Sequence, residues 1–168
     1  EVGETTGEGI SGKEINAKKS EEDKIQNPSG ETLFRDVIFD AETIATRIET
    51  LAQDIARELP DDVLIIVVLK GSFVFAADLL RALDRAGMRP RVDFVTLSSY
   101  GTAVESSGTV NLSRDISEDV RGRTVMIIDD ILDTGRTLAF ATDLMTARGA
   151  AAVHTCVLLD KHEKREVN

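Results

Sequence analysis

Hydrophobic positions recur along the chain with two different spacings, which predict an alternation of helices and strands. Between residues 41 and 58 the apolar side chains return at helical spacing, so one apolar stripe is expected on a helix there. Asp40 stands where a helix N-cap is expected, and Pro60 follows the end of the pattern. The stripe consists of Ile44, Ile48, Leu51, Ile55 and Leu59.

Short apolar segments predict the strands of a sheet. The first, "VLIIVVL", is apolar throughout and rich in β-branched residues, which is typical of a strand buried on both faces. Further helices are expected before Gly87 and Gly149, because glycine is common just beyond a helix end. The order predicts an α/β domain with a mainly parallel central sheet flanked by helices. The expected strands are 63–69, 92–97, 124–129 and 152–159, and the expected helices are 73–86 and 136–148.

Two stretches lack either spacing. Residues 1–33 hold few large apolar residues and predict a polar, flexible N-terminal extension, with a regulatory or partner-binding arm as the alternative. The folded domain is accordingly expected to span residues 34–168. Residues 98–123 are rich in serine, glycine and charge, and a short hairpin is predicted around 108–114.

Composition and charge exclude several classes of protein. The formal net charge of −10 argues against a nucleic-acid binder that neutralises phosphates. The longest apolar run, Val63–Leu69, is far shorter than the roughly 20 residues that span a bilayer, so no membrane association is expected. Cys156 is the single cysteine, which excludes an intramolecular disulfide and favours a reducing, cytoplasmic compartment. Both Cys156 and His154 fall in an expected strand and are interpreted as sheet or core residues.

Ligands of parallel α/β sheets bind beyond the carboxyl ends of the strands. Three segments follow such ends here: Lys70-Gly71, residues 98–101 and residues 129–137. The last of them lies in "VMIIDDILDTGRTL", where an apolar strand leads to Asp129 and Asp130, and Asp133 stands three residues further on.

This string suits a phosphorylated sugar. The helix that opens after Asp133 presents free amide groups and a partial positive charge, which bind phosphate. Paired carboxylates suit vicinal hydroxyls and Mg²⁺ instead, so the combination points to a ribose 5-phosphate. The simpler alternative is an acidic loop in which Asp130 or Asp133 only caps the helix. The sequence contains neither a P-loop nor a dinucleotide-binding glycine pattern.

The same string resembles the signature with which type I phosphoribosyltransferases bind 5-phosphoribosyl pyrophosphate (PRPP). Three other segments resemble the hypoxanthine and hypoxanthine–guanine phosphoribosyltransferases, in the family's order: "VLKGSFVFAADLLRAL" at 68–83, "SSYGTAVESSG" at 98–108 and "VLLDKHEKREV" at 157–167. The resemblance runs from about Val37 to Val167 and implies the fold of that family.

The resemblance implies a role for each residue of the acidic string. Asp129 and Asp130 match the acidic pair that holds the ribose hydroxyls with Mg²⁺ nearby, bound directly or through water. Many relatives carry glutamate at the first of these positions, so Asp129 is a shorter variant. Asp133 matches the proposed general base toward the purine imidazole nitrogen. The 5′-phosphate loop matches Thr134, Gly135, Arg136 and Thr137.

The other segments supply the rest of the implied site. Lys70 and Gly71 match the pyrophosphate-binding loop, where the peptide bond before the lysine is often cis. Ser99 and Tyr100 match a lid that closes over PRPP, and Lys161 matches the lysine that donates to the purine 6-oxygen.

The implied activity is Mg²⁺-dependent transfer of phosphoribose from PRPP to hypoxanthine or guanine, giving IMP or GMP and pyrophosphate. Another base, xanthine first, and a non-catalytic sensor of PRPP or nucleotide on the same fold are the alternatives. The family also implies a homo-oligomer, a dimer or tetramer. Its members continue past the position of Asn168 with a purine-stacking segment, so the base-binding hood is expected to be incomplete in this sequence.

Overall fold

The computed structural model describes residues 24–26, 32–34, 38–99, 110–161 and 165–167, and its contacts divide the chain into residues 1–46 and 47–168. In the first unit, two three-residue strands pair antiparallel: β1 (Lys24–Gln26) and β2 (Thr32–Phe34). Sequence reasoning did not foresee them, because strands this short carry no readable periodicity. The domain boundary after residue 33 stays a prediction.

Helix α1 (Ala41–Glu58) has the predicted bounds. The Thr43 amide donates to Asp40 Oδ1 at 2.7 Å, and the Ile44 amide donates to the Asp40 carbonyl. Asp40 is therefore the N-cap, as its position indicated. The hydrogen bond from the Thr43 backbone is the main cause that lowers the pKa of Asp40.

A five-stranded sheet forms the centre of residues 47–168, in the order β5-β4-β3-β6-β7. The parallel strands are β3 (Leu64–Leu69), β4 (Arg91–Ser99), β6 (Thr124–Leu132) and β7 (Ala152–Asp160). The edge strand β5 (Val110–Arg114) runs antiparallel to β4. The predicted mainly parallel α/β sheet is confirmed.

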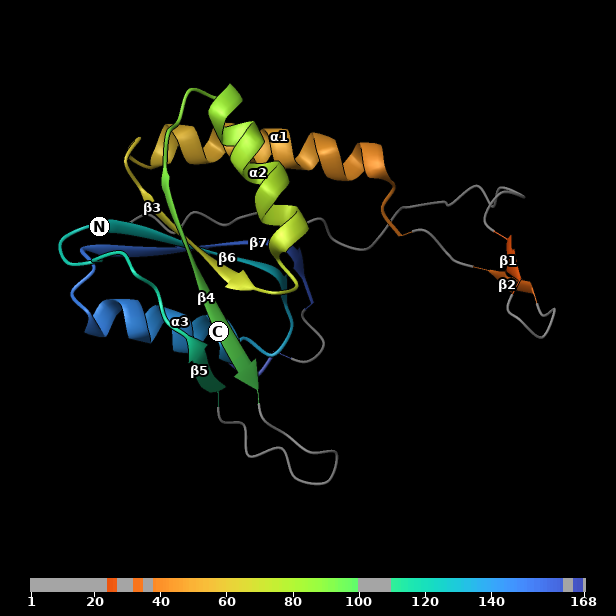
Figure 1. The fold of residues 1–168 in the computed structure, drawn as a ribbon. Coiled ribbons are helices and arrows are strands. Elements are labelled where there is room, and N and C mark those ends of the chain that lie inside the picture. The colour runs from red at the N-terminus through yellow and green to blue at the C-terminus, as the bar shows by residue number, and fades with distance from the viewer. Residues whose placement is uncertain (1–23, 27–31, 35–37, 100–109, 162–164, 168) are drawn as a thin grey trace. The chain divides into compact units, whose positions relative to one another are not determined.

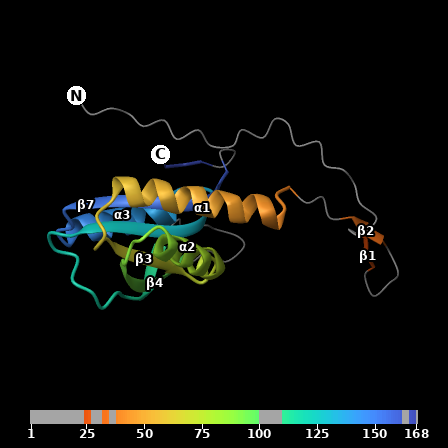
Figure 2. The ribbon, with the colours of Figure 1, turned by 90° about the horizontal axis from the view of Figure 1, so that it is seen from above.

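Helices cover both faces of this sheet. Residues 47–58 of α1 and helix α2 (Phe73–Arg85) lie over one face, and α3 (Arg136–Ala147) lies over the other (Figure 1; seen from above in Figure 2). Strands β3 and β6 are consequently buried on both faces, as their apolar runs predicted. The core on the α3 side consists of Leu64, Ile66, Val68, Val95, Val120, Val125, Ile127, Leu138, Ala141 and Met145. Among the described residues, no helix is both long and apolar enough to cross a membrane.

Two predicted boundaries differ from the structure for reasons of strand pairing. The sequence predicts that the third strand ends at residue 129, but β6 continues to Leu132 because its last residues pair with β7, up to Leu132 opposite Asp160. The hairpin expected around 108–114 is also different, because residues 110–114 form one strand that pairs with the end of β4. In both cases the partner is distant in sequence, so local periodicity could not reveal it.

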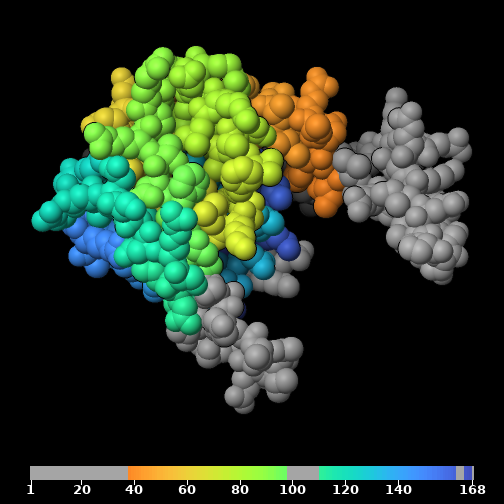
Figure 3. Space-filling view, in the orientation of Figure 1, coloured from red at the N-terminus to blue at the C-terminus, as the bar shows by residue number. Residues whose placement is uncertain are grey.

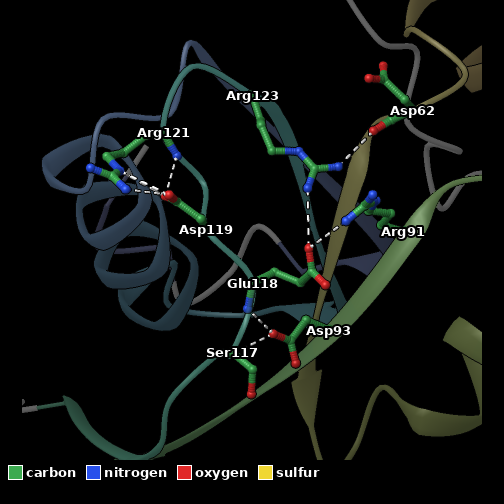
Figure 4. A network of polar contacts seen from close by, with 8 residues as sticks. All are labelled: Asp62, Arg91, Asp93, Ser117, Glu118, Asp119, Arg121 and Arg123. Atoms are coloured by element: carbon green, nitrogen blue, oxygen red, sulfur yellow. Dashed lines mark hydrogen bonds and ion pairs between the residues drawn. The ribbon is translucent and has the colours of Figure 1, made fainter.

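A polar network ties the amino ends of three parallel strands together (Figure 4). Arg91 and Arg123 both contact Glu118 Oε2 at 3.3 Å, and Arg123 also donates to the Asp62 carbonyl at 3.1 Å. Asp93 accepts hydrogen bonds from the backbone amides of Phe94, Ser117 and Glu118 at 2.7, 2.5 and 2.9 Å. The network therefore lies at the end of the sheet opposite the carboxyl ends of the parallel strands. It fixes residues 117–123, which lead into β6.

The cysteine and the histidine of β7 lie in the sheet, as interpreted from the sequence. Cys156 is buried, and this burial raises the pKa of its thiol to about 12. A thiol with so high a pKa is protonated at neutral pH and a poor nucleophile. His154 is exposed on the same strand.

Candidate active site

The strand order brings the carboxyl ends of β3 and β6 side by side. From β3 the chain moves to β4 on one side, and it later returns to place β6 on the other side of β3. A reversal of this kind is the switch point at which open α/β sheets bind ligands. Two of the segments selected from the sequence, Lys70-Gly71 and 129–137, follow these two strands.

The loop after β3 packs directly on the last part of β6, at Asp130. A Cβ atom on Gly71 would lie 2.7 Å from Asp130 Oδ2, closer than real side chains approach. The Leu69–Lys70 peptide bond is cis, as the family resemblance implied. Ser72 is buried, and its hydroxyl donates to the Val68 carbonyl, which anchors the end of the loop. Lys70 and Gly71 are exposed, and the start of α2 after them lies on the surface (yellow-green in Figure 3).

Asp129 and Asp130 lie in the part of β6 that extends beyond its pairing with β3. The pairing with β3 ends at Ile128 opposite Val67, while the pairing with β7 continues past Asp129. Burial is the largest cause that raises the pKa of Asp129 to about 7, and its interaction with the neighbouring Asp130 raises it further. The Asp130 amide donates to Asp129 Oδ1 at 3.0 Å. The acidic pair therefore carries less than its full negative charge near neutral pH.

The acidic pair fits a magnesium ion that retains water. Among the described residues, no group of three or more His, Cys, Asp or Glu side chains is arranged to hold a metal. Mg²⁺ is commonly held by only one or two carboxylates together with waters and substrate phosphates, and Asp129 and Asp130 supply this donor set.

Asp133 follows the end of β6, and the residue is half-buried. Its Oδ1 is buried and has no hydrogen-bond partner in the described part of the chain. The N-cap of α3 is Gly135, with no side-chain cap hydrogen bond, so neither Asp130 nor Asp133 caps this helix. The simpler interpretation of the acidic string is wrong on this point. The buried Oδ1 of Asp133 is therefore a hydrogen-bond acceptor that no described residue uses.

Residues 134–137 form the turn into α3. Gly135 has a φ of +87°, in the left-handed region that favours glycine. The Arg136 amide approaches Thr134 Oγ1 at 3.4 Å, and the first turn of α3 contains no acidic side chain. The first amides of α3, including that of Thr137, have no carbonyl partner within the helix, so this turn suits an anion.

Lys161 stands one residue after β7, beside the same loop. Its backbone amide donates to the Leu132 carbonyl at 2.9 Å, while the residue is exposed. Ser99 is the last residue of β4, and its backbone pairs with Val110. Tyr100 and the remainder of the expected lid, 101–108, lie outside the described residues.

Sequence reasoning assigned no role to three residues that contact this site. Arg165 Nε donates to the Asp133 carbonyl at 3.3 Å, and the amides of Glu166 and Val167 both donate to the Thr134 carbonyl. Glu166 also forms an ion pair with Arg136. These residues belong to a run of charges that reads as a solvated loop, and only their contacts identify them.

Comparison with known proteins agrees with this geometry. Residues 35–168 match the phosphoribosyl transferase domain family. The chain is 37% identical over 134 residues to the hypoxanthine-guanine phosphoribosyltransferase of Aquifex aeolicus, covering 79% of this chain and 74% of that protein. It is 36% identical over 136 residues to the hypoxanthine phosphoribosyltransferase of Escherichia coli strain K12, covering 79% and 75%.

A solved structure is similar along most of its length. The hypoxanthine-guanine phosphoribosyltransferase of Bacillus anthracis superposes with a TM-score of 0.72 at 38% identity, covering 80% of this chain and 78% of that one. The chain belongs to the phosphoribosyl transferase family, and it is an enzyme with the type I fold. Within the family, its similarity to the hypoxanthine and hypoxanthine-guanine phosphoribosyltransferases confirms the resemblance seen in the sequence.

Proposed function

We propose that the protein salvages purines by transferring 5-phosphoribose from PRPP to hypoxanthine or guanine, with Mg²⁺, to give IMP or GMP and pyrophosphate. One observation carries the proposal: the buried Oδ1 of Asp133, which has no hydrogen-bond partner among the described residues, stands between the acidic pair and the start of α3. Relatives at 36–37% identity bear the names of hypoxanthine and hypoxanthine-guanine enzymes, which supports this choice of base.

PRPP binding is assigned to the two loops at the switch point. The amides of the 134–137 turn receive the 5′-phosphate, and the hydroxyls of Thr134 and Thr137 add donors. Asp129 and Asp130 accept hydrogen bonds from the ribose hydroxyls. Lys70 and the backbone at Gly71 receive the pyrophosphate, next to Asp130. Ser99 and Tyr100 close over PRPP and exclude water, which would otherwise hydrolyse it.

Transfer breaks the bond between the anomeric carbon and the pyrophosphate oxygen and forms a bond from that carbon to a purine nitrogen. Asp133 accepts or shares the proton of the purine imidazole ring, and its negative charge stabilises the oxocarbenium-like transition state. Lys161 donates to the 6-oxygen and so favours oxopurines over adenine. Bound Mg²⁺, held by Asp129 and Asp130, would neutralise charge on the departing pyrophosphate.

The test is nucleotide formation by the full chain with PRPP, Mg²⁺ and one base at a time: hypoxanthine, guanine, xanthine or adenine. We expect product with hypoxanthine or guanine. Exclusive use of xanthine or adenine would contradict the assigned base. Failure with every base while PRPP still binds in calorimetry would support the non-catalytic sensor instead.

The role of Asp133 is tested with one variant and one matched control variant. Asp133→Asn keeps the shape of the side chain but removes the proton acceptor, so we expect kcat to fall about 100-fold or more. Asp143→Asn, on the exposed side of α3, is the control and should leave kcat unchanged. Normal turnover by Asp133→Asn would overturn the mechanism.

The dimer or tetramer implied by the family stays a prediction, which analytical ultracentrifugation would test.

A further inference from the structure

Residues 165–167, here named the strap, contact the loop that carries Asp133 residue by residue. Arg165 Nε donates to the Asp133 carbonyl at 3.3 Å. The amides of Glu166 and Val167 donate to the Thr134 carbonyl at 2.9 and 3.1 Å. A Cβ on Gly135 would collide with the carbonyl oxygen of Val167, so the strap also packs against the turn itself.

Side chains add to these backbone contacts. Glu166 forms an ion pair with Arg136, the first residue of α3. Arg165 forms a second ion pair with Asp160, the last residue of β7, and its side chain is only 18% exposed. A single guanidinium group therefore connects the Asp133 carbonyl to the end of β7. This fork of donors is specific to arginine, whose planar group reaches two acceptors at fixed angles.

The side chain of Asp133 needs such support. Its buried Oδ1 has no hydrogen-bond partner among the described residues, so that oxygen receives no hydrogen bond that would fix the rotation of the carboxyl group. The orientation then depends on the backbone of residue 133, whose carbonyl Arg165 holds. A catalytic group must be held within a fraction of an ångström of its productive position to act efficiently.

We propose that Arg165 is a positioning residue for the transfer reaction: by bridging the Asp133 carbonyl and Asp160, it orients the carboxyl group of Asp133. The proposal rests on the proposed function for the role of Asp133. Asp160 immediately precedes Lys161, whose amide donates to the Leu132 carbonyl, so the bridge made by Arg165 connects the backbone at Asp133 to the end of β7.

The kinetic test uses Arg165→Gln, Arg165→Lys and a matched control, Arg121→Gln. Arg121 also pairs with a nearby aspartate, Asp119, but at the opposite end of the strands. We expect Arg165→Gln to lower kcat about 10- to 100-fold and to change the KM for PRPP less than about threefold, because the strap amides open more often but stay paired with the Thr134 carbonyl most of the time. Arg165→Lys should recover part of the loss, since it keeps the charge opposite Asp160. Arg121→Gln should behave as the unmodified protein.

A double-mutant cycle separates positioning from general stabilisation. If Arg165 acts through Asp133, Arg165→Gln should cost less than about threefold in kcat when Asp133→Asn is already present. An additive loss would overturn the proposal, because it would show that Arg165 acts independently of the Asp133 carboxylate.

A readout without turnover keeps the test independent of the proposed function. The amides of Glu166 and Val167 donate to the Thr134 carbonyl, so their hydrogen exchange reports whether strap and loop stay together. We expect exchange at least about tenfold faster in Arg165→Gln and unchanged in Arg121→Gln. Unchanged exchange in Arg165→Gln overturns the proposal whatever the activity. If the unmodified chain formed no nucleotide with any of the four bases, the proposed function would be contradicted. The hydrogen-exchange rates alone would then decide whether Arg165 holds the loop.

Discussion

The carboxylate of Asp130 occupies the space that a side chain on residue 71 would need. A Cβ built on Gly71 comes within 2.7 Å of Asp130 Oδ2 and 3.2 Å of Asp130 Cγ. Gly71 follows β3 and Asp130 lies in the last part of β6, and the order of the strands brings these distant residues into contact. The loop after β3 therefore packs directly against the acidic pair.

Gly71→Ala should therefore impair the site more than the fold. The added methyl group displaces the Asp130 carboxylate or the backbone of the loop, so we expect the KM for PRPP to rise at least about tenfold. Gly87→Ala is the control: φ is +90° there, but nothing lies within 4 Å of its Cβ position. That variant should lose about 1 kcal/mol of stability and keep its kinetics. Equal kinetics for the two variants would contradict the packing argument.

Gly135 and Gly149 offer a closer comparison, because both have a φ of +87°. Alanine at either position carries similar backbone strain, about 1 to 2 kcal/mol. At Gly149 the nearest atom to a Cβ is Arg121 Cγ at an ordinary 3.5 Å, whereas at Gly135 the Val167 carbonyl blocks the methyl group. We expect only Gly135→Ala to weaken PRPP binding, measured by calorimetry, while thermal unfolding registers both. Unimpaired PRPP binding by Gly135→Ala would exclude this turn from the phosphate site.

Asp129 should make the free energy of unfolding decrease as the pH rises, which is the opposite of the effect of most aspartates. Its pKa is about 7 in the folded chain against an ordinary 3.8, mainly because of burial. The folded state then binds more protons than the unfolded state between about pH 4 and 7, so the free energy of unfolding falls as the pH rises through that range. After allowance for screening by solvent, we expect a contribution of about 1 to 2 kcal/mol.

Asp129→Asn is the test of this pH dependence. Asparagine stays neutral, so the variant should be as stable as the parent near pH 4 and about 1 to 2 kcal/mol more stable near pH 8, without Mg²⁺ or substrate. Urea unfolding at several pH values gives the comparison. Parallel pH profiles for the two proteins would rule out the raised pKa.

Asp93 should support the fold and leave the chemistry alone. Burial by itself would raise its pKa, but hydrogen bonds from the amides of Glu118, Phe94 and Ser117 together lower it below the usual value. Asp93→Asn weakens these charge-assisted bonds and should cost about 2 kcal/mol of stability, with kcat and KM unchanged. Its loss should shrink toward low pH, where the parent carboxylate is protonated too.

Asp119→Asn is the control within the same network (Figure 4). Asp119 is fully exposed, and hydrogen bonds from the Arg121 side chain are the main cause that lowers its pKa to about 2. Because this exposed pair joins residues only two apart, its removal should leave the melting temperature unchanged. Equal melting temperatures for Asp93→Asn and Asp119→Asn would contradict the assigned role of Asp93.

The sequence by itself determined most helices and strands of the α/β domain and predicted the chemistry of its site. Helical spacing and an N-cap predicted α1, and continuous apolar runs predicted β3 and β6. Both patterns arise because burial on one face or on two faces of an element determines which positions must be apolar. The acidic string before a helix start indicated a ribose phosphate, since those groups serve that ligand in any fold. The family resemblance then implied individual roles for Lys70 and Lys161, which stay predictions.

Tertiary structure decided which of these groups meet. The contact of Gly71 with Asp130 depends on strand order, and the length of β6 depends on its pairing with β7, which no local pattern encodes. The hydrogen bond of Arg165 could not be predicted for the same reason. In the sequence Arg165 is one charged residue among several, and its partner Asp133 lies 32 residues away. Local propensities act over a few residues, whereas the positions of catalytic groups are set by packing between distant segments.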